Sequence, residues 1–330
     1  MATIGIIGAG AWGTALGQSF ARNGHDVILW ARDSGLADTI NTQHENPAYL
    51  PGQTLHHGIA ATNDLARTCE AEILVPVIPA QYMRETLKRA APHIGSGKPL
   101  VVCAKGIEIA SGRFMSQVAE SILPTARVGI LSGPNFAHEV AKGLPAAATL
   151  ACADPDDFQT VRDTLASKSL RLYLSDDVIG TQIGGAVKNV IAIVCGIVAG
   201  RGLGENTRAA VVTRGLHEMA RLSEALGGRR ETLMGLSGIG DLILTCSSMQ
   251  SRNFSLGHAL GKGKSLQDIL KERSGVTEGV PTTEALAALA ARDKIDMPLV
   301  MALQSCLTGQ MSIEEAMHAL LERPYQMEND

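Results

Sequence analysis

The N-terminal segment carries the feature that most restricts the fold of this chain. The apolar run Thr3–Ile7 is followed at once by Gly8-Ala9-Gly10-Ala11-Trp12-Gly13, a GxGxxG sequence, and then by a segment of helical period, 14–23. A second apolar run, Asp26–Trp30, comes next. Strand, glycine turn, helix and strand in this order form the opening unit of a dinucleotide-binding fold. The sequence therefore predicts a parallel α/β sheet whose first turn approaches a pyrophosphate.

Each glycine of this motif has a separate task in such a fold. Gly8 makes the tight turn, Gly10 lets the backbone approach the pyrophosphate, and Gly13 allows the helix to pack closely on the strand. The pyrophosphate would lie at the helix N-terminus, where unpaired N–H groups and the helix dipole attract an anion. The alternative is a glycine-rich turn that binds no ligand.

The residues after the second strand bear on the choice between NAD and NADP. An acidic residue at this place binds the ribose 2′-hydroxyl, whereas an arginine accommodates a 2′-phosphate. The chain has Arg32 followed by Asp33. Arg32 favours tolerance of NADP and Asp33 keeps NAD possible. The alternative for Arg32 is an ordinary solvated arginine.

The first half of the chain alternates apolar runs with helical patterns, which indicates a mostly parallel sheet covered on both faces. The further candidate strands are 73–78, 100–103, 128–131, 147–151 and 170–174. Strand patterns end near Ile179, and helical patterns follow at 184–199, 207–226, 266–271, 283–292, 299–307 and 313–321. The sequence thus predicts an α/β Rossmann-type domain over 1–180 and an all-α domain over 181–330.

The composition limits the classes of partner. The 330-residue chain has 29 basic and 33 acidic residues, a net charge of -4 and only 3% aromatic residues. It lacks the basic surplus and the aromatic residues that nucleic-acid binding uses, so no nucleic-acid partner is expected. Its 6 scattered cysteines without a CxxC pair indicate reduced, buried thiols in a cytoplasmic protein. Its 9 histidines show no HExxH spacing, so no metal site is predicted.

The apolar N-terminus does not have the pattern of a signal peptide. It lacks a basic region, and glycines interrupt the apolar run. The longest strongly apolar segment, 190–199, is about half as long as a bilayer span requires. We therefore expect no membrane span.

Two lysines stand in unusual surroundings. Lys105 follows the strand-like run 100–103, so it belongs at the carboxyl end of a parallel strand, where open α/β sheets bind ligands. Lys188 lies in the apolar helical sequence Gly-Gly-Ala-Val-Lys-Asn-Val-Ile. Desolvation in such a helix lowers the pKa of a lysine and suits it to proton exchange near neutral pH. The alternative for Lys188 is a side chain whose charged end reaches water at the helix edge.

An acidic residue and a polar triplet mark the second half of the chain. Asp241 is embedded in the sequence Gly-Ile-Gly-Asp-Leu, and we expect a lysine as its partner, because an unpaired buried charge is unfavourable. Ser251, Arg252 and Asn253 precede the helix-like segment 255–260. An arginine fork beside the N–H groups of a helix start can bind a phosphate. The alternative is a polar loop that caps the helix.

The chain resembles the bacterial NAD(P)-dependent glycerol-3-phosphate dehydrogenases over residues 4–321. The segments that carry the resemblance are, in order, GAGAWGTAL from Gly8, AKGIE from Ala104, LSGPNFAHEVAKGLPAA from Leu131, GGAVKNVIAI from Gly184, TRGLHEM from Thr213, GIGDLILTC from Gly238, QSRN from Gln250 and VTEGVPT from Val276. Several such blocks in one order are far more specific than any single motif.

The resemblance implies that sn-glycerol 3-phosphate and dihydroxyacetone phosphate are interconverted with NADPH or NADH. The implied catalytic residues are Lys188 as proton donor and acceptor, Lys105 beside substrate and nicotinamide, and Asp241, which would orient Lys188. The implied substrate-binding residues are Lys105, Gly133, Asn135, Lys188, Asp241, Ser251, Arg252 and Asn253. The implied cofactor-binding residues are Gly8, Gly10, Ala11, Trp12, Gly13, Arg32, Tyr49, Lys105, Ala137, Arg252, Val276 and Glu278.

Two positions depart from the pattern of this family. Asn135 stands where serine or threonine is usual. The amide keeps a donor and an acceptor but reaches further, so we expect a shift in substrate affinity with unchanged chemistry. Ala11 replaces a common serine beside the phosphate turn, and a backbone N–H can serve there, so a small effect is expected.

The resemblance also implies a homodimer whose reductive reaction supplies the backbone of glycerophospholipids. Two other functions remain as alternatives. A 3-hydroxyacid or 6-phosphogluconate-type dehydrogenase pairs a similar fold with a helical domain. A non-catalytic dinucleotide-sensing module is the other, although the two lysines and the anion-binding triplet argue against it, because a sensor needs no proton donor.

Overall fold

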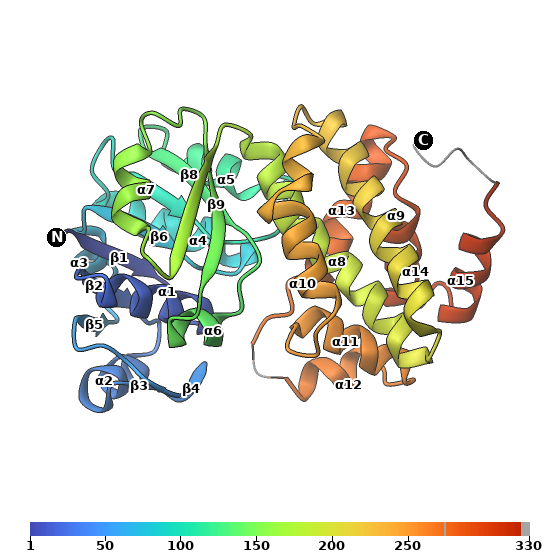
Figure 1. Ribbon diagram of the computed structural model, residues 1–330, viewed down its shortest axis with the longest axis horizontal. Coiled ribbons are helices and arrows are strands. Elements are labelled where there is room, and N and C mark those ends of the chain that lie inside the picture. The colour runs from blue at the N-terminus through green and yellow to red at the C-terminus, as the bar shows by residue number, and fades with distance from the viewer. Residues whose placement is uncertain (274, 325–330) are drawn as a thin grey trace. The chain divides into compact units, whose positions relative to one another are not determined.

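The chain divides into two compact units, whose larger parts are coloured from blue to green and from yellow-green to red in Figure 1. The computed structural model describes residues 1–273 and 275–324. Unit 1 comprises Met1–Lys105 and Phe114–Val178, and unit 2 comprises Gly106–Arg113 and Ile179–Asp330. The sequence places the boundary after residue 180 and gives no sign that Gly106–Arg113 belongs with the second unit. Residues 325–330 of the predicted second domain lie outside the described residues.

Unit 1 is built on an 8-stranded sheet with the order β10-β9-β8-β7-β6-β1-β2-β5. Its strands are β1 (Thr3–Ile7), β2 (Asp26–Trp30), β5 (Ile59–Thr62), β6 (Ile73–Pro76), β7 (Pro99–Val102), β8 (Arg127–Ser132), β9 (Ala146–Cys152) and β10 (Leu170–Ser175). Neighbouring strands are parallel except β8 and β9, which are antiparallel. The run from β5 to β8 reproduces the strand order of a dinucleotide-binding sheet, with its switch point between β1 and β6. The predicted Rossmann-type fold is confirmed.

Helices cover both faces of this sheet. The helices are α1 (Ala11–Arg22), α2 (Ser34–Gln43), α3 (Leu65–Cys69), α4 (Ala80–Ala90), α5 (Met115–Ile122), α6 (Ala137–Lys142) and α7 (Gln159–Leu165), with a 3₁₀ turn at Ala91–His93. Leu16 of α1 and Val161 of α7 belong to one buried apolar cluster. Met83 of α4 and Val118 of α5 belong to a second cluster. A sheet buried on both faces explains why its central strands read as continuous apolar runs.

The predicted strand bounds agree best at the start of the chain. The ranges of β1 and β2 are as predicted, and the other predicted strands differ by one or two residues at their ends. The sequence did not predict β5 or the small hairpin of β3 (Glu45–Asn46) and β4 (Leu50–Thr54). These segments are short, and β4 contains Pro51 and Gly52 with mostly exposed positions, so it has no continuous apolar run.

From Ile179 on, the regular secondary structure of the described part of unit 2 is helical, whereas its short segment Gly106–Arg113 contains no helix. Its helices are α8 (Val178–Arg201), α9 (Gly204–Ala225), α10 (Asp241–Cys246), α11 (Arg252–Gly261), α12 (Leu266–Lys271), α13 (Gly279–Asp293), α14 (Pro298–Leu307) and α15 (Ile313–Leu321). A 3₁₀ turn (η2, Glu231–Met234) and a π-helical turn (η3, Leu236–Gly240) precede α10. The bounds of α12 and α15 are as predicted, whereas α8, α9 and α13 begin earlier than predicted.

Helix α8 is the central helix of unit 2 and is apolar on all sides. Among the described residues it is the one helix that is long and apolar enough to cross a membrane. The sequence indicates only a shorter apolar run, 190–199, and did not predict a helix of this length. However, 89% of its apolar window is buried inside the structure. A helix that is hydrophobic all round and buried in this way has the surroundings of a core helix.

A carboxylate of one helix caps another helix in unit 2. Glu218 of α9 accepts hydrogen bonds from the backbone N–H groups of Leu299 (2.6 Å) and Val300 (3.3 Å). These groups lie at the N-terminus of α14, which has no side-chain cap of its own. Burial raises the pKa of Glu218 from 4.5 to about 7, although the two backbone bonds and Arg221 lower it. Glu218 therefore links stability to pH.

We expect the free energy of unfolding to fall as the pH rises from acid to neutral because of Glu218. The native state holds the Glu218 proton more tightly than the unfolded chain, so this stabilisation is complete below pH 4.5 and is lost as the pH rises through about 7. The expected loss is on the order of 3 kcal/mol. Urea unfolding of the Glu218→Gln variant, which cannot titrate, should show a flatter pH dependence over this window. Equal pH slopes in the two proteins would rule out this assignment.

Candidate active site

The glycine turn after β1 is shaped to leave space at a helix N-terminus. Gly8 has a φ of +128°, and a Cβ there would lie 2.5 Å from the Val77 carbonyl oxygen. A Cβ on Gly13 would lie 1.9 Å from the Gly8 carbonyl oxygen, so only glycine permits this close packing. At Gly10, by contrast, a Cβ would meet nothing within 4 Å. The backbone is thus crowded behind the turn and open at Gly10.

The N-terminus of α1 fits a dinucleotide pyrophosphate. Gly10 is the N-cap of α1 and provides no side-chain cap, and no acidic residue lies in the first turn, which includes Ala11 and Trp12. The first N–H groups of a helix have no partner within the helix, so this end presents donors to an anion. The open space at Gly10 and the uncapped donors are the features that a bound pyrophosphate requires.

A buried asparagine holds the glycine turn from behind. Asn46 of β3 is 0% exposed, and its Nδ2 donates to the Ala9 carbonyl oxygen (2.9 Å) and to Thr14 Oγ1 (2.8 Å). Its Oδ1 accepts from the backbone N–H of Tyr49, a residue that is 46% exposed. The sequence analysis missed Asn46, because it lies in a short hairpin with no local signal. The hairpin places Tyr49 beside the segment that supports the turn.

The two residues after β2 have different surroundings. Asp33 is the N-cap of α2, and its Oδ1 accepts a hydrogen bond from the Gly35 N–H at 2.8 Å. Arg32 is exposed. The Asp33 carboxylate, which could have bound the ribose of NAD, is therefore engaged in capping a helix. The Arg32 side chain is accessible to a ligand.

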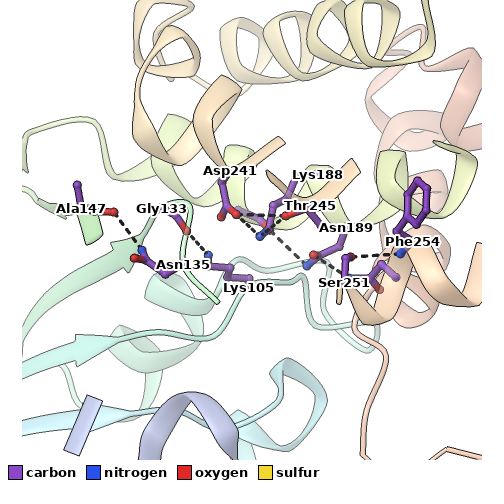
Figure 2. A network of polar contacts seen from close by, with 12 residues as sticks. Lys105, Gly133, Asn135, Ala147, Lys188, Asn189, Asp241, Thr245, Ser251 and Phe254 are labelled. Atoms are coloured by element: carbon purple, nitrogen blue, oxygen red, sulfur yellow. Dashed lines mark hydrogen bonds and ion pairs between the residues drawn. The ribbon is translucent and has the colours of Figure 1, made fainter. Parts of the chain in front are cut away.

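Lys105 lies past the carboxyl end of β7 in a small polar group of unit 1 (Figure 2). Its Nζ donates to the Gly133 carbonyl oxygen at 3.1 Å. Asn135 Nδ2 donates to the Ala147 carbonyl oxygen at 3.0 Å, while its Oδ1 is buried and has no hydrogen-bond partner among the described residues. An acceptor in that state is unfavourable unless a ligand donates to it.

Cys103 connects this group with the glycine turn. The Cys103 thiol shares a hydrogen bond with the Trp12 side chain and lies close enough to Lys105 to be influenced by its charge. Burial nevertheless raises the pKa of this thiol to about 12, so it stays protonated. Trp12, from the helix start, and Lys105, from the end of β7, therefore belong to one edge of the sheet. Ala137 begins α6, after Asn135.

Lys188 forms a buried polar network in unit 2 (Figure 2). Its Nζ makes an ion pair with Asp241 and donates a hydrogen bond to Thr245 Oγ1 at 3.0 Å. The Thr245 hydroxyl in turn donates to Asp241 Oδ1 at 3.2 Å. The exposed fractions are 8% for Lys188, 1% for Asp241 and 5% for Thr245. Asp241 thus has the lysine partner that the sequence predicts, and Lys188 is buried rather than solvated at a helix edge.

A glycine of α8 allows this network to form. Gly184 lies one helical turn before Lys188, and a Cβ there would lie 2.2 Å from the Ser237 carbonyl oxygen. The η3 turn can therefore rest directly on α8, and α10 starts at Asp241 as η3 ends. Thr245 is four residues further along α10, on the same face as Asp241. This spacing is the sequence signal that could have identified Thr245.

The polar triplet at the start of α11 has mainly a structural arrangement. Ser251 is the N-cap and accepts from the Phe254 N–H at 3.2 Å. Asn253 Nδ2 donates to Asn189 Oδ1 on α8 (2.9 Å), and Asn253 Oδ1 accepts from the Gly279 N–H at the start of α13 (2.9 Å). Asn253 therefore ties three helices together and keeps at most one N–H for a ligand.

Arg252 is the exposed member of the triplet. The structure places Val276 and Glu278 in the segment between α12 and α13, where both are half-buried.

The residues predicted from the sequence therefore gather in two groups. The glycine turn, Trp12, Lys105, Gly133 and Asn135 belong to unit 1, and the Lys188 network and the α11 triplet belong to unit 2. Asn189, next to Lys188, was not identified from the sequence.

Metal-ligand clusters and disulfide bonds are absent among the described residues. Among the described residues no group of three or more histidine, cysteine or acidic side chains is placed to hold a metal ion. All six cysteines are free thiols, five of them buried, as the sequence predicts.

The fold and these residues define the class as a dinucleotide-dependent oxidoreductase. The family model of the NAD-dependent glycerol-3-phosphate dehydrogenase N-terminus matches residues 3–157, and that of the C-terminus matches residues 177–318. The glycerol-3-phosphate dehydrogenase (NAD(P)+) of Rhodospirillum rubrum is 53% identical, covering 98% of this chain and 93% of its own length. That of Parvibaculum lavamentivorans is 50% identical and covers 98% of both chains.

A solved structure agrees with these relatives. The crystal structure of glycerol-3-phosphate dehydrogenase from Coxiella burnetii has a TM-score of 0.93 and 37% identity, and the match covers 98% of this chain and 99% of that one. The chain belongs to the NAD-dependent glycerol-3-phosphate dehydrogenase family. Neither the hydroxyacid dehydrogenase nor the sensing module is favoured by these relatives.

Proposed function

We propose that this protein interconverts sn-glycerol 3-phosphate and dihydroxyacetone phosphate with NADPH or NADH. In the oxidative direction sn-glycerol 3-phosphate and NAD(P)+ give dihydroxyacetone phosphate, NAD(P)H and a proton. The names of the close relatives support this reaction. The observation that carries it is the buried Lys188–Asp241–Thr245 network, because reduction of a carbonyl needs a proton donor next to the reacting oxygen.

The residues of the glycine turn and the N-terminus of α1 would hold the cofactor. Gly8, Gly10, Ala11, Trp12 and Gly13 suit its pyrophosphate, for the reasons of space and donors given above. When bound, a nicotinamide dinucleotide supplies the hydride, while the protein supplies position and charge.

Lys188 would move the proton. Its Nζ carries the proton to be given to the carbonyl oxygen, and in the reverse direction it accepts the proton of the hydroxyl group. Asp241 compensates the charge of the ammonium group, and Thr245 fixes its direction by a hydrogen bond of 3.0 Å. Together they hold Nζ in one orientation before the substrate arrives.

Lys105, Arg252 and Asn135 would position the substrate. Lys105 adds positive charge near an oxygen that becomes negative during the reaction. The exposed guanidinium of Arg252 suits the phosphate group, which an arginine binds with two parallel hydrogen bonds. The buried Oδ1 of Asn135 lacks a partner among the described residues and can accept a hydrogen bond from a substrate hydroxyl.

The first experiment follows the absorbance of reduced nicotinamide with purified protein, dihydroxyacetone phosphate, and NADPH or NADH in parallel. Oxidation that requires the phosphorylated ketone is expected. Dihydroxyacetone without phosphate is the control. If the protein binds NADPH but oxidises it with neither ketone, the proposed reaction is wrong.

The same assay tests the role of Arg32 in cofactor choice. We expect Arg32→Ala to lower kcat/KM for NADPH roughly tenfold and to leave that for NADH nearly unchanged, because only NADPH carries a 2′-phosphate. Arg67→Ala, at an exposed arginine of α3, is the matched control. Equal losses with both cofactors would show that Arg32 does not read the 2′-phosphate.

The family resemblance supports three further proposals about the protein in the cell. It would act as a homodimer, in the cytoplasm, and in the reductive direction, which supplies the glycerol phosphate backbone of glycerophospholipids. Light scattering after size-exclusion chromatography tests the dimer, since a monomer at working concentration would contradict it.

A further inference from the structure

A cavity within unit 2 lies beside Arg252, and its lining residues Arg273 and Thr277 have no part in the proposed reaction. It has a volume of about 300 Å³. Its lining residues are Arg252, Ser255, Glu272, Arg273, Gly275 and Thr277. The first two belong to the first turn of α11, whose start at Ser251 is visible in Figure 2, and the others belong to the segment between α12 and α13.

Two guanidinium groups meet at this cavity. Arg273 Nη1 donates to the backbone carbonyl oxygen of Arg252 at 2.7 Å, and Arg273 Nη2 donates to Ser255 Oγ at 3.0 Å. A Cβ on Gly275 would lie 3.0 Å from Arg252 Nη1, so the Arg252 side chain passes over this glycine. Burial and the charge of Arg252 lower the pKa of Arg273, and the charge of Glu272 only partly opposes them. The two cations therefore stand close enough to repel each other.

Within the described residues no carboxylate neutralises this pair by an ion pair. Glu272 also lines the cavity, but its carboxylate pairs with Lys264 at 2.9 Å. Like charges held together at a cavity favour an anion that can accept hydrogen bonds from both. The charge balance of the lining thus points to an anionic ligand.

Thr277 provides an independent indication. It lines the cavity and is 4% exposed, and its Oγ1 is buried without a hydrogen-bond partner in the part of the chain that is described. A buried hydroxyl without a partner is unfavourable, and buried polar groups in native proteins nearly always have one. A ligand oxygen in the cavity would supply the partner.

We propose that this cavity is a phosphate-binding subsite in which Arg273 and Thr277 act together with Arg252 and Ser255. The two guanidinium groups and the Thr277 hydroxyl offer the donors that a phosphate group accepts. The Ser255 hydroxyl donates to the Arg252 carbonyl oxygen and accepts from Arg273, so its part is to hold Arg273 in place. The subsite depends on the proposed function only for the identity of the molecule that carries the phosphate. That molecule is the triose substrate, the dinucleotide or free phosphate.

The test is calorimetric titration of the full chain with inorganic phosphate. We expect Thr277→Val, which removes only the hydroxyl, to weaken binding roughly fivefold or more, and Arg273→Met to weaken it roughly 10- to 100-fold. Thr277→Ser and Arg273→Lys should restore part of the affinity. Thr277→Val should not unfold the protein, because removing an unpaired buried hydroxyl does not destabilise it.

A second threonine provides the matched control. Thr282 of α13 is 0% exposed, its Oγ1 also lacks a partner among the described residues, and it does not line the cavity. Thr282→Val should leave the dissociation constant of phosphate unchanged. If Thr282→Val weakens binding as much as Thr277→Val does, the effect is general and the proposal is overturned.

Further titrations identify the carrier of the phosphate. Selective weakening of glycerol 3-phosphate, of both NADH and NADPH, of NADPH alone, or of inorganic phosphate alone would each support the subsite and assign it to one source. Unchanged binding of all four ligands in both Thr277→Val and Arg273→Met would overturn it. Failure of the proposed function is distinguishable, because it appears as absent turnover in the unmodified protein whatever the phosphate titrations show.

Discussion

Replacing Lys188 by alanine is expected to lower kcat by roughly a hundred- to ten-thousand-fold, the range typical of a lost proton donor. The affinity for NADPH should stay nearly unchanged, because the residues that suit the cofactor pyrophosphate lie in unit 1 and Lys188 lies in unit 2. Initial rates at saturating substrate and a fluorescence titration with NADPH measure the two quantities. Normal turnover at saturation, combined with lost NADPH binding, would contradict the proposed role.

Controls are needed because Lys188→Ala removes the cation that forms an ion pair with the buried carboxylate of Asp241. The double variant Lys188→Met/Asp241→Asn removes both charges, and it should be as inactive as Lys188→Ala while folding more stably. Lys271→Ala, at an exposed lysine of α12, should keep full activity. An active double variant would show that neither side chain handles the proton.

Replacing Asp241 by asparagine is expected to destabilise unit 2 by about 3 kcal/mol or more. The substitution removes the carboxylate that pairs with the ammonium group of Lys188, which is only 8% exposed. Urea unfolding followed by far-UV circular dichroism is the suitable measurement, because unit 2 is helical. Both tryptophans, Trp12 and Trp30, lie in unit 1, so their fluorescence reports the other unit.

A double-mutant cycle separates this ion pair from general damage to the core. In the background Lys188→Met, the same change at Asp241 should cost much less, since no buried cation remains to be stranded. If Asp241→Asn is equally destabilising with and without Lys188, the ion pair does not account for the loss of stability.

The opening of the sheet could be predicted from the sequence because its determinants are local. In β1, the glycine turn and β2, each residue's task depends on its immediate neighbours, and both strands have their predicted bounds. The antiparallel pairing of β8 with β9 has no such signal, since an apolar run reads the same in either direction. The early starts of α8 and α13 were missed because Gly184 and Gly279 mark close packing here rather than helix ends.

The candidate site likewise contains residues that the sequence identified and residues that it could not identify. Lys105 and Lys188 attracted attention because a charge next to an apolar run is unusual locally, and the need of Asp241 for a lysine followed from the desolvation of its carboxylate. Thr245 could also have been predicted from the sequence, because it lies four residues after Asp241. The role of Arg273 could not have been predicted, because it depends on contacts with Arg252 and Ser255 across two separate elements.

The sequence by itself determined the dinucleotide-binding opening, the change from α/β to helical structure and the residue types of the chemistry. The tertiary structure alone decided which polar groups are already engaged. Asn253 ties α8 to α13, and Glu218 caps α14 across 81 positions of chain. The physical reason is that backbone periodicity and local turns depend on neighbouring residues, whereas the partner of a buried hydrogen-bonding group depends on which distant segments the core brings together.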